Sequence, residues 1–369
     1  MNSTDRPRVR ISSVAGFLAA IPPMLGFTPG NSLVVVGLTS AGRVQVAFRY
    51  DLPDPPGAGI AADMAGHALS VLSSHKLSIA VVAGYGPGRL VTPLADAYRA
   101  AAPRAGIRLQ DVLRVEDGRY WSYLCTDPAC CPPEGAAFDP VTDPAGRAMA
   151  ALGQRVLASR DAVAATIAPV TGADAQAMQR ATVQAERAAA RLVARKGPQG
   201  LERPGLTAIR AAIGLYRDGG QVVPAIGFAW LALMLRRLRI RDDAWARMDP
   251  ACRAAHQRLW TDLVRRAQPG YLAAPASLLA FTAWQDGNGA LANLSLDRAL
   301  ADQPDYSMAL LLRDILDAGT PPRAAVPPMT PEQVAESYAA PEPSPAKDSQ
   351  PGEPSDRPPD DSGPGTNSR

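Results

Sequence analysis

The hydrophobic pattern between residues 32 and 140 alternates between strand-like and helix-like segments. The run LVVVGL at Leu33–Leu38 is continuous and rich in β-branched residues, which is typical of a strand buried on both faces. VQVAFRY at Val44–Tyr50 alternates in polarity and predicts a neighbouring strand with one exposed face. A helix over about Ala61–Ser74 and a second buried strand at Ile79–Ala83 follow. This order predicts an α/β domain with a mixed, largely parallel sheet covered by helices.

The rest of the predicted sheet follows a glycine-rich loop. The segment Gly84–Gly88 (GYGPG) leads from the second buried strand into a helix that we expect to end near Ala102. Strands at Ile107–Val115 and Tyr120–Leu124 complete the sheet, joined by the turn Glu116–Gly118.

The N-terminal segment places basic residues before an apolar stretch, as a signal peptide does. Pro22 and Pro23 interrupt that stretch, so we predict a short surface helix. The longest apolar run elsewhere, Ala225–Leu235, is too short to cross a bilayer. We therefore expect a cytoplasmic protein with no membrane partner, whose four cysteines are reduced thiols.

The second half of the chain shows only helical periodicity. Apolar residues recur at helical spacing over 147–318, with Gly and Pro breaks that suggest seven or eight helices. From residue 319 onward Pro, Ser, Asp and Gly dominate, and such a segment buries too little apolar surface to order itself. We predict an α/β domain over 1–142, an all-α domain over 143–320 and a disordered tail over 321–369.

The last helices carry a single repeat-like pattern. Five residues fall at the offsets of a tetratricopeptide repeat: Leu279, Ala292, Leu296, Ala299 and Pro304. The Trp, Gly and Tyr expected on its first helix are replaced by Ala276, Ala280 and Ala283. No second copy is found, and a solenoid needs about three repeats. We predict one helical hairpin packed on the rest of the domain, with a peptide-binding groove as the lesser alternative.

Composition and charge exclude little. The chain is 47% hydrophobic and 20% charged with a net charge of +3, as in a soluble globular protein. Its abundant Ala, Arg, Pro and Gly are typical of a bacterial genome of high GC content. Basic residues gather in the helical half, for example Arg236, Arg237, Arg239 and Arg241. Binding of nucleic acid through these helices is one hypothesis, but solvated helix faces explain the charge as well, and we favour them.

Three segments together resemble a known family. They are PPMLGFTPGNSLVVVGL, VEDGRYWSYLCTDPACCPPEG and AWQDGNGALANLSLDRALADQPDYSMALLL. In the same order they are similar to the bacterial domain of unknown function family 4192, over about residues 9–322. The resemblance implies a cytosolic protein with an α/β part followed by a helical part, and it implies no activity, ligand or catalytic residue.

Three cysteines form the most unusual cluster: Cys125, Cys130 and Cys131, followed by two prolines. They could bind zinc, with a fourth ligand from Cys252, His67, His75 or His256. Zinc ligands are usually paired two to four residues apart, and adjacent cysteines are expected to point in different directions. A redox pair is a further alternative, although no C-x-x-C is present. We favour a structural thiol cluster without metal, buried at a tight domain junction.

The glycines of the loop after the second buried strand are Gly84, Gly86 and Gly88. Backbone N–H groups at a helix N-terminus form a natural anion site, and open α/β sheets bind ligands beyond their strand ends. The spacing is neither a dinucleotide fingerprint nor a P-loop. Pro87, expected at the first helical position, fits a purely structural connection equally well.

The last predicted strand carries two aromatic residues on one face. Trp121 and Tyr123 alternate with Tyr120 and Ser122, so the two pairs lie on opposite faces. The first pair could contact a ligand, although packing between domains is our default. Arg119 at the strand start could meet an anionic ligand or pair with a carboxylate.

The sequence supports several functions of different class. No Ser–His–Asp or Cys–His set can be assembled from three scattered histidines, so catalytic residues stay unknown and no cofactor is indicated. The first hypothesis is a ligand-binding or scaffold module without catalysis. The second is an enzyme acting on a phosphorylated or nucleotide-like small molecule at the Gly84–Gly88 loop, which implies a small anionic ligand. The third, nucleic-acid binding, is the least favoured.

Overall fold

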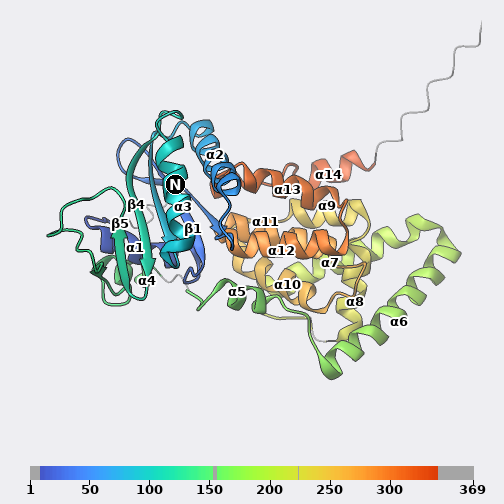
Figure 1. Cartoon of the computed structure of the whole chain (residues 1–369). Helices are drawn as coiled ribbons and strands as arrows, with labels where there is room; N and C mark the ends of the chain where they lie inside the picture. The colour runs from blue at the N-terminus through green and yellow to red at the C-terminus, as the bar shows by residue number, and fades with distance from the viewer. Residues whose placement is uncertain (1–8, 153–155, 223, 340–369) are drawn as a thin grey trace, which may run out of the picture.

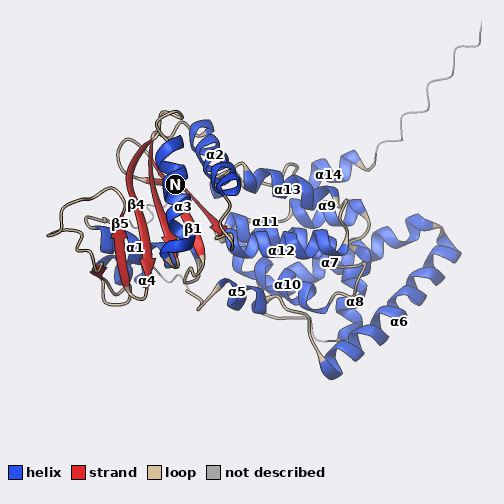
Figure 2. Cartoon of the chain, viewed as in Figure 1, coloured by secondary structure: helices blue, strands red, loops and turns tan. Residues whose placement is uncertain are grey.

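A computed structural model describes residues 9–152, 156–222 and 224–339 (Figure 1). Within these residues, all the strands lie in the N-terminal part of the chain, and the rest is mostly helical (Figure 2). The predicted class is confirmed: a mixed sheet with helices precedes a mostly helical region.

One sheet contains all six strands, in the order β2-β1-β3-β4-β5-β6. The strands are β1 (Ser32–Leu38), β2 (Val44–Asp51), β3 (Ile79–Tyr85), β4 (Arg108–Glu116), β5 (Arg119–Ser122) and β6 (Ala136–Ala137). Only β3 and β4 pair in parallel, and the other four neighbouring pairs are antiparallel. The sheet is mixed, as predicted, but the expectation that it is largely parallel is wrong.

The connections explain this difference. Helix α2 (Ala58–Ser74) joins β2 to β3, but β1 lies between those two strands and runs against both. Helix α3 (Gly88–Ala101) joins β3 directly to its neighbour β4, which gives the parallel pair. Alternating strands and helices therefore indicate crossovers correctly, but they do not reveal a strand inserted between the two that a helix connects.

Helices cover both faces of the sheet. On one face α2 and α3 contribute Leu69, Leu72 and Leu94 to a core that includes Val82 of β3. The other face is covered by α1 (Val14–Leu25), which contacts α4 (Pro144–Ala151). Leu18 and Ile21 of α1 are at most 1% exposed, so the expectation of a surface helix is wrong. The apolar stretch between the basic segment and Gly26 is instead part of the core.

The helical region packs around one core. Its helices are α5 (Arg160–Thr166), α6 (Gly172–Lys196), α7 (Glu202–Arg217), α8 (Ala225–Met234), α9 (Leu238–Ala246), α10 (Arg253–Arg266), α11 (Ala273–Gln285), α12 (Gly289–Asp302) and α13 (Ser307–Asp317). Together with α4, which packs on α1, these are ten helices in the described residues, more than the seven or eight expected. The break between α8 and α9 contains neither Gly nor Pro, which is why periodicity did not separate them. None of the helices described is long and apolar enough to cross a membrane.

The predicted helical hairpin corresponds to α11 and α12. Ala276, Ala280 and Ala283 of α11 are at most 1% exposed, and Ala292 and Ala299 of α12 are fully buried. Because alanine side chains are small, the two helix backbones can approach closely at these positions. The hairpin lies within the core of the helical region.

The start of the predicted disordered tail is wrong. Residues 321–339 are described, and they include α14 (Pro331–Ser337). Thr330 and Gln333 form a capping box at the start of this helix, and Val334 is 1% exposed. The Tyr338 hydroxyl donates a 2.6 Å hydrogen bond to Asp242. A few well-placed anchors thus order a Pro-rich segment, and the remainder of the predicted tail, 340–369, lies outside the described residues.

The α/β and helical regions meet where α2 approaches the end of α13 (Figure 1). His75 at the end of α2 hydrogen-bonds through Nε2 with the Ala318 carbonyl at 2.9 Å. A Cβ at Gly319 would lie 2.8 Å from Val71, so the backbone passes closely over α2. We propose the division after residue 142 as the boundary between an α/β and a helical domain, and the helical domain extends beyond residue 320 to include α14.

Candidate functional site

A cavity of about 510 Å³ lies just beyond the carboxyl ends of β3 and β4, the parallel pair. Open α/β sheets bind their ligands at this end of the strands. Its walls come from α1, the segment before β1, the two strand ends and the segment after β6. The lining residues are Leu18, Pro22, Thr28, Pro29, Gly30, Asn31, Tyr85, Gly86, Pro87, Val115, Glu116, Asp117, Gly118, Phe138 and Pro140.

The walls of this cavity are mostly apolar with a small acidic edge. Leu18, Val115 and Phe138 and four prolines supply the apolar part. Glu116 and Asp117 are the charged lining residues, and the lining includes no Lys or Arg. Glu116 also lies 4.0 Å from the Arg114 guanidinium, which offsets part of its charge, so the small anionic ligand expected from the sequence stays a hypothesis.

Tyr85 forms part of the cavity wall at the end of β3. It is 8% exposed, and its hydroxyl oxygen has no hydrogen-bond partner among the described residues. Burial raises the pKa of this hydroxyl, so it stays neutral. An unpaired buried hydroxyl is costly, which makes Tyr85 an unusual wall residue.

The three glycines of the loop have different roles. A Cβ at Gly84 would lie 2.3 Å from Val91, so this glycine lets α3 pack against β3. Gly86 has φ +150 and lines the cavity, and its N–H donates to the Val115 carbonyl at 2.9 Å. A Cβ at Gly88 would lie 2.3 Å from Arg114. Pro87 is the N-cap of α3, one position earlier than expected.

The side chains of Trp121 and Tyr123 both lie on the α3 side of the sheet. Their alternation with Tyr120 and Ser122 predicted that they share a face. The Arg114 guanidinium lies 3.8 Å from the centre of the Trp121 ring. The Tyr123 hydroxyl hydrogen-bonds with Thr92 of α3 at 2.7 Å. The default of packing between domains is wrong, because these contacts are made within the α/β region. Of the six candidate ligand-binding residues, Gly86 is the one that lines the cavity.

Arg119 and Trp121 instead hold the loop between β5 and β6, residues 123–135. Arg119 donates from Nη1 to the Gly135 carbonyl at 2.8 Å. The Trp121 indole donates from Nε1 to the Pro133 carbonyl at 2.9 Å. A Cβ at Gly135 would lie 2.5 Å from the indole ring, so the loop backbone packs directly on it. Both side chains fasten the part of the loop that follows the cysteines.

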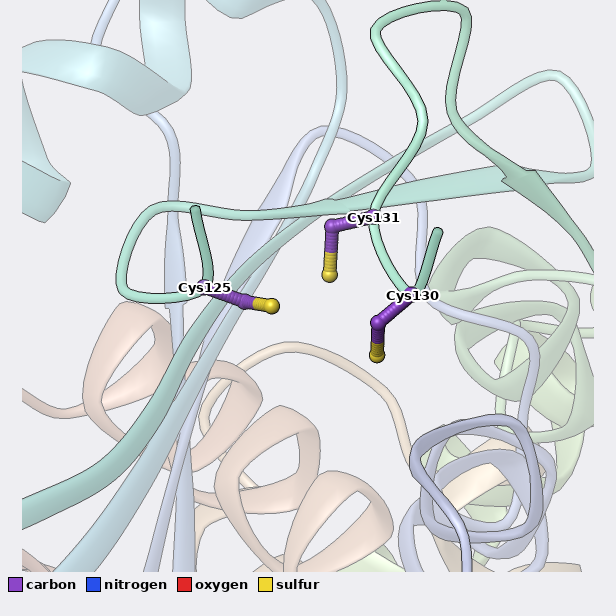
Figure 3. A group of neighbouring side chains, drawn as sticks. All are labelled: Cys125, Cys130 and Cys131. Atoms are coloured by element: carbon purple, nitrogen blue, oxygen red, sulfur yellow. The ribbon is translucent and has the colours of Figure 1, made fainter. Parts of the chain in front are cut away.

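The three cysteines of this loop turn their thiols toward one another (Figure 3). The Sγ atoms of Cys125, Cys130 and Cys131 all lie within 4.8 Å of one another. Cys130 is exposed, and the other two are half-buried. Two expectations are therefore wrong: the adjacent cysteines do not point apart, and the thiols are not buried at a domain junction. The reason is that the chain between residues 125 and 130 turns back on itself.

Asp127 organises that turn. Its carbonyl accepts from the backbone N–H of Cys130 at 3.1 Å and of Cys131 at 2.7 Å. Its carboxylate accepts from the Ala129 N–H at 2.9 Å. On the other side the Ser122 hydroxyl accepts from the Cys125 N–H at 3.0 Å. Each cysteine backbone is thus held by a hydrogen bond.

The thiols influence one another's ionisation. The pKa of Cys125 is lowered, first by a hydrogen bond from the Cys131 thiol and then by the Asp127 backbone N–H. The pKa of Cys131 is raised to about 12, first by its burial and then by its hydrogen bonds with Cys125 and Cys130. A thiolate at Cys125 is therefore stabilised by its neighbours. Cys131, in contrast, keeps its thiol proton unless a bound cation displaces that proton.

The fourth ligands considered from the sequence lie elsewhere. Cys252 is the N-cap of α10, and no fourth metal-ligating side chain joins the three cysteines among the described residues. The Nδ1 of His67 lies 2.8 Å from the Tyr50 hydroxyl. His256 is 2% exposed and stacks on Trp260.

A second cavity, of about 530 Å³, was not predicted from the sequence. It lies between α7, the end of α9 and residues 326–333, and it includes Arg210, Arg217 and Arg247. Arg210 and Arg247 both hydrogen-bond the buried Asp243. Burial raises the pKa of that carboxyl, but these hydrogen bonds outweigh it and hold the pKa below its usual range. The cavity was missed because one wall belongs to the segment expected to be disordered.

The basic cluster in the helical region is largely engaged within the protein. Arg239 pairs with Glu202, and Arg241 pairs with Asp242 at 2.6 Å. The Arg236 guanidinium lies 5.3 Å from the centre of the Tyr271 ring. Arginines with partners of this kind are less available to phosphates, which weakens the case for nucleic acid.

Comparison with known proteins gives one match. The family model described as Domain of unknown function (DUF4192) matches residues 15–323. No curated protein and no solved structure matches the chain.

Proposed function

We propose that this chain, which belongs to the DUF4192 family, is a binding module for a small molecule without catalysis of its own. The ligand would occupy the cavity beyond the carboxyl ends of β3 and β4. The observation that carries the proposal is this cavity itself, about 510 Å³ in volume and built from five separate segments of the chain. Ligand sites are typically concave, mostly apolar and about 300–1,000 Å³ in volume.

The shape of the cavity is largely preformed. Four of its lining residues are prolines, which restrict the backbone of three wall segments and of α1. The Gly86 N–H bond to the Val115 carbonyl fixes the ends of β3 and β4 relative to each other. A preformed site loses little conformational entropy when the ligand binds.

The lining favours a neutral or cationic ligand with an apolar body. Asp117, and Glu116 to the extent that its pairing with Arg114 at 4.0 Å leaves it free, would attract a positive group or accept hydrogen bonds from a neutral donor. Thr28 and Asn31 offer both donors and acceptors at the same cavity. No Lys or Arg lines the cavity to bind a phosphate, so an enzyme acting on phosphorylated substrates is less well supported. Nucleic-acid binding remains the least favoured function, since the clustered arginines have partners within the protein.

A thermal-shift screen tests this function. The probes are aromatic and aliphatic amines, neutral nucleosides and, as the contrasting class, sugar phosphates. A ligand at 100 times its Kd adds about 2.7 kcal/mol to the free energy of unfolding. We expect at least one amine or neutral compound to raise the melting temperature and the phosphates to have no effect. Shifts produced by phosphates only, or by none of the compounds, would refute the proposal.

Two variants place the ligand. The double substitution Glu116→Gln and Asp117→Asn removes both cavity carboxylates, and Asn tolerates the positive φ of 49° at position 117. We expect it to abolish the shift produced by a cationic compound. Asp63→Asn, at an exposed position of α2, is the matched control and should leave the shift unchanged.

We also propose a cytoplasmic location. The support is the group of three free thiols within 4.8 Å of one another, which an oxidising compartment would convert to a disulfide. Cell fractionation with an antibody to the chain tests this, and recovery in the periplasmic or secreted fraction would contradict it.

A further inference from the structure

We propose that Cys125, Cys130 and Cys131 bind one zinc ion through three thiolates, with the fourth coordination position left to solvent or to an external ligand. This site is separate from the cavity and does not depend on the function proposed for it. The observation that leads to it is that the three sulfur atoms lie close together on one loop (Figure 3).

The distances suit zinc. A Zn–S bond is about 2.3 Å long, so two sulfurs of a tetrahedral site lie about 3.8 Å apart. The three Sγ atoms already lie within 4.8 Å of one another. Small rotations of the cysteine side chains therefore close the site, without any change in the backbone. Thiolate sulfur is a soft ligand that selects zinc over magnesium or calcium.

The loop backbone preorganises the ligands. The Asp127 carbonyl holds the N–H groups of both Cys130 and Cys131, at 3.1 and 2.7 Å. This arrangement orients two adjacent residues that would otherwise be free to turn apart. Trp121 and Arg119 fasten the following segment through the Pro133 and Gly135 carbonyls.

The fourth position is open to solvent. Cys130 is exposed, so water reaches the group of sulfurs. No fourth Cys, His, Asp or Glu completes the group among the residues described. Structural zinc sites use four protein ligands, whereas three protein ligands with an open position are typical of sites that bind a water or a substrate atom. The arrangement therefore fits a zinc ion that can accept an exchangeable ligand.

Cobalt and zinc titrations of the full, reduced chain test the site. We expect the wild type to bind about one Co²⁺, with a thiolate charge-transfer band and the intense visible bands of tetrahedral cobalt, and Zn²⁺ to displace it. Cys125→Ser, Cys130→Ser and Cys131→Ser should each weaken binding by at least about 100-fold. Cys252→Ser is the matched control, because Cys252 lies on α10, and it should bind as the wild type does.

A second measurement uses only the wild type, so it does not depend on whether the variants fold. Zinc should protect Cys125, Cys130 and Cys131 from alkylation, and leave the reactivity of Cys252 unchanged. Three results would overturn the proposal. They are the absence of the cobalt bands in fully reduced protein, an equal loss of metal affinity in Cys252→Ser, and alkylation of the three cysteines at the same rate with and without zinc.

Discussion

The indole Nε1 of Trp121 donates a 2.9 Å hydrogen bond to the carbonyl oxygen of Pro133, two residues beyond the last cysteine of the cluster. Trp121 lies on β5, which pairs with β4 at the centre of the α/β region. The bond therefore connects a rigid strand to the loop that carries the three thiols. Such supporting interactions orient the ligands of a metal site.

Trp121→Phe tests this connection. Phenylalanine keeps an aromatic ring beneath Arg114 but removes the donor, so the loop loses one attachment. We expect zinc affinity to fall by about 10-fold, at the lower end of effects measured for supporting residues. Competition with a chromophoric chelator measures it.

The matched control for this prediction is Trp284→Phe. The Trp284 indole also donates to one backbone carbonyl, that of Thr320, at 3.0 Å, but it does so in the helical region. Trp121→Phe should lower the free energy of unfolding by about 1 kcal/mol, the usual net value of one hydrogen bond. Trp284 is 6% exposed, so Trp284→Phe also leaves core space unfilled and should lower that free energy by more. If Trp284→Phe weakens zinc binding as much as Trp121→Phe does, the loss reflects general destabilisation, and Trp121 does not position the site.

Sequence reasoning located most of the strands because their β-branched runs are bounded by turns. It identified the crossover from β3 to β4 but not the position of β1 between β2 and β3, since that position depends on contacts between distant segments. α1 was expected at the surface because its pattern, with Pro22 and Pro23, does not show which side faces the sheet.

The candidate site residues stay a prediction, but the structure shows contacts that the sequence could not reveal. Trp121 and Tyr123 share a face, and they hydrogen-bond with the cysteine loop and with Thr92. From their spacing alone, the three thiols were not expected to lie together. The spacing does not reveal the turn at Asp127, whose carbonyl accepts hydrogen bonds from the N–H groups of Cys130 and Cys131. The cavity was anticipated at the strand ends, but its acidic edge depends on which side chains of distant segments meet there.

Gly84→Ala tests the close packing of α3 on β3. A Cβ at this position would lie 2.3 Å from Val91 and 2.8 Å from a second carbon of the same side chain, so the helix or the strand must shift. We expect a loss of about 1–3 kcal/mol in the free energy of unfolding, as for other overpacked cores. Urea denaturation followed by circular dichroism measures it.

Gly66→Ala serves as the control for this substitution. Gly66 lies within α2, and a Cβ there would meet nothing within 4 Å. Alanine has a higher helix propensity than glycine, so the free energy of unfolding of this variant should rise by about 0.5–1 kcal/mol. Equal effects of the two substitutions would contradict the close packing inferred at Gly84.

His256 should make the protein less stable in acid. Burial, together with the charge of Arg217, lowers the pKa of His256 from 6.5 to about 4. Neither ring nitrogen has a well-formed hydrogen bond within the described part of the chain, and the charge of Asp249 and the Arg247 backbone offset only part of the lowering of the pKa. Below pH 6.5 the unfolded chain binds a proton that the folded chain does not. The stability contributed by neutral His256 is therefore complete above about pH 6.5 and is lost as the pH falls to about 4.

His256→Leu measures this contribution. Between pH 6.5 and pH 4 the free energy of unfolding of the wild type should fall by about 3 kcal/mol more than that of the variant. This amount follows from the difference between the folded and unfolded pKa values. At pH 7 the variant should be as stable as the wild type or more so, because it removes two unsatisfied polar atoms. A parallel pH dependence of wild type and His256→Leu would show that His256 is protonated in the folded protein.

X-ray absorption at the zinc edge tests the three-thiolate site most directly. The sample is the full chain, fully reduced and loaded with one equivalent of zinc. The geometry of Cys125, Cys130 and Cys131 predicts three sulfur atoms at about 2.3 Å and one oxygen or nitrogen atom at about 2.0 Å in the first coordination shell. A shell made only of oxygen and nitrogen atoms, or one with a single sulfur, would contradict the zinc site proposed here.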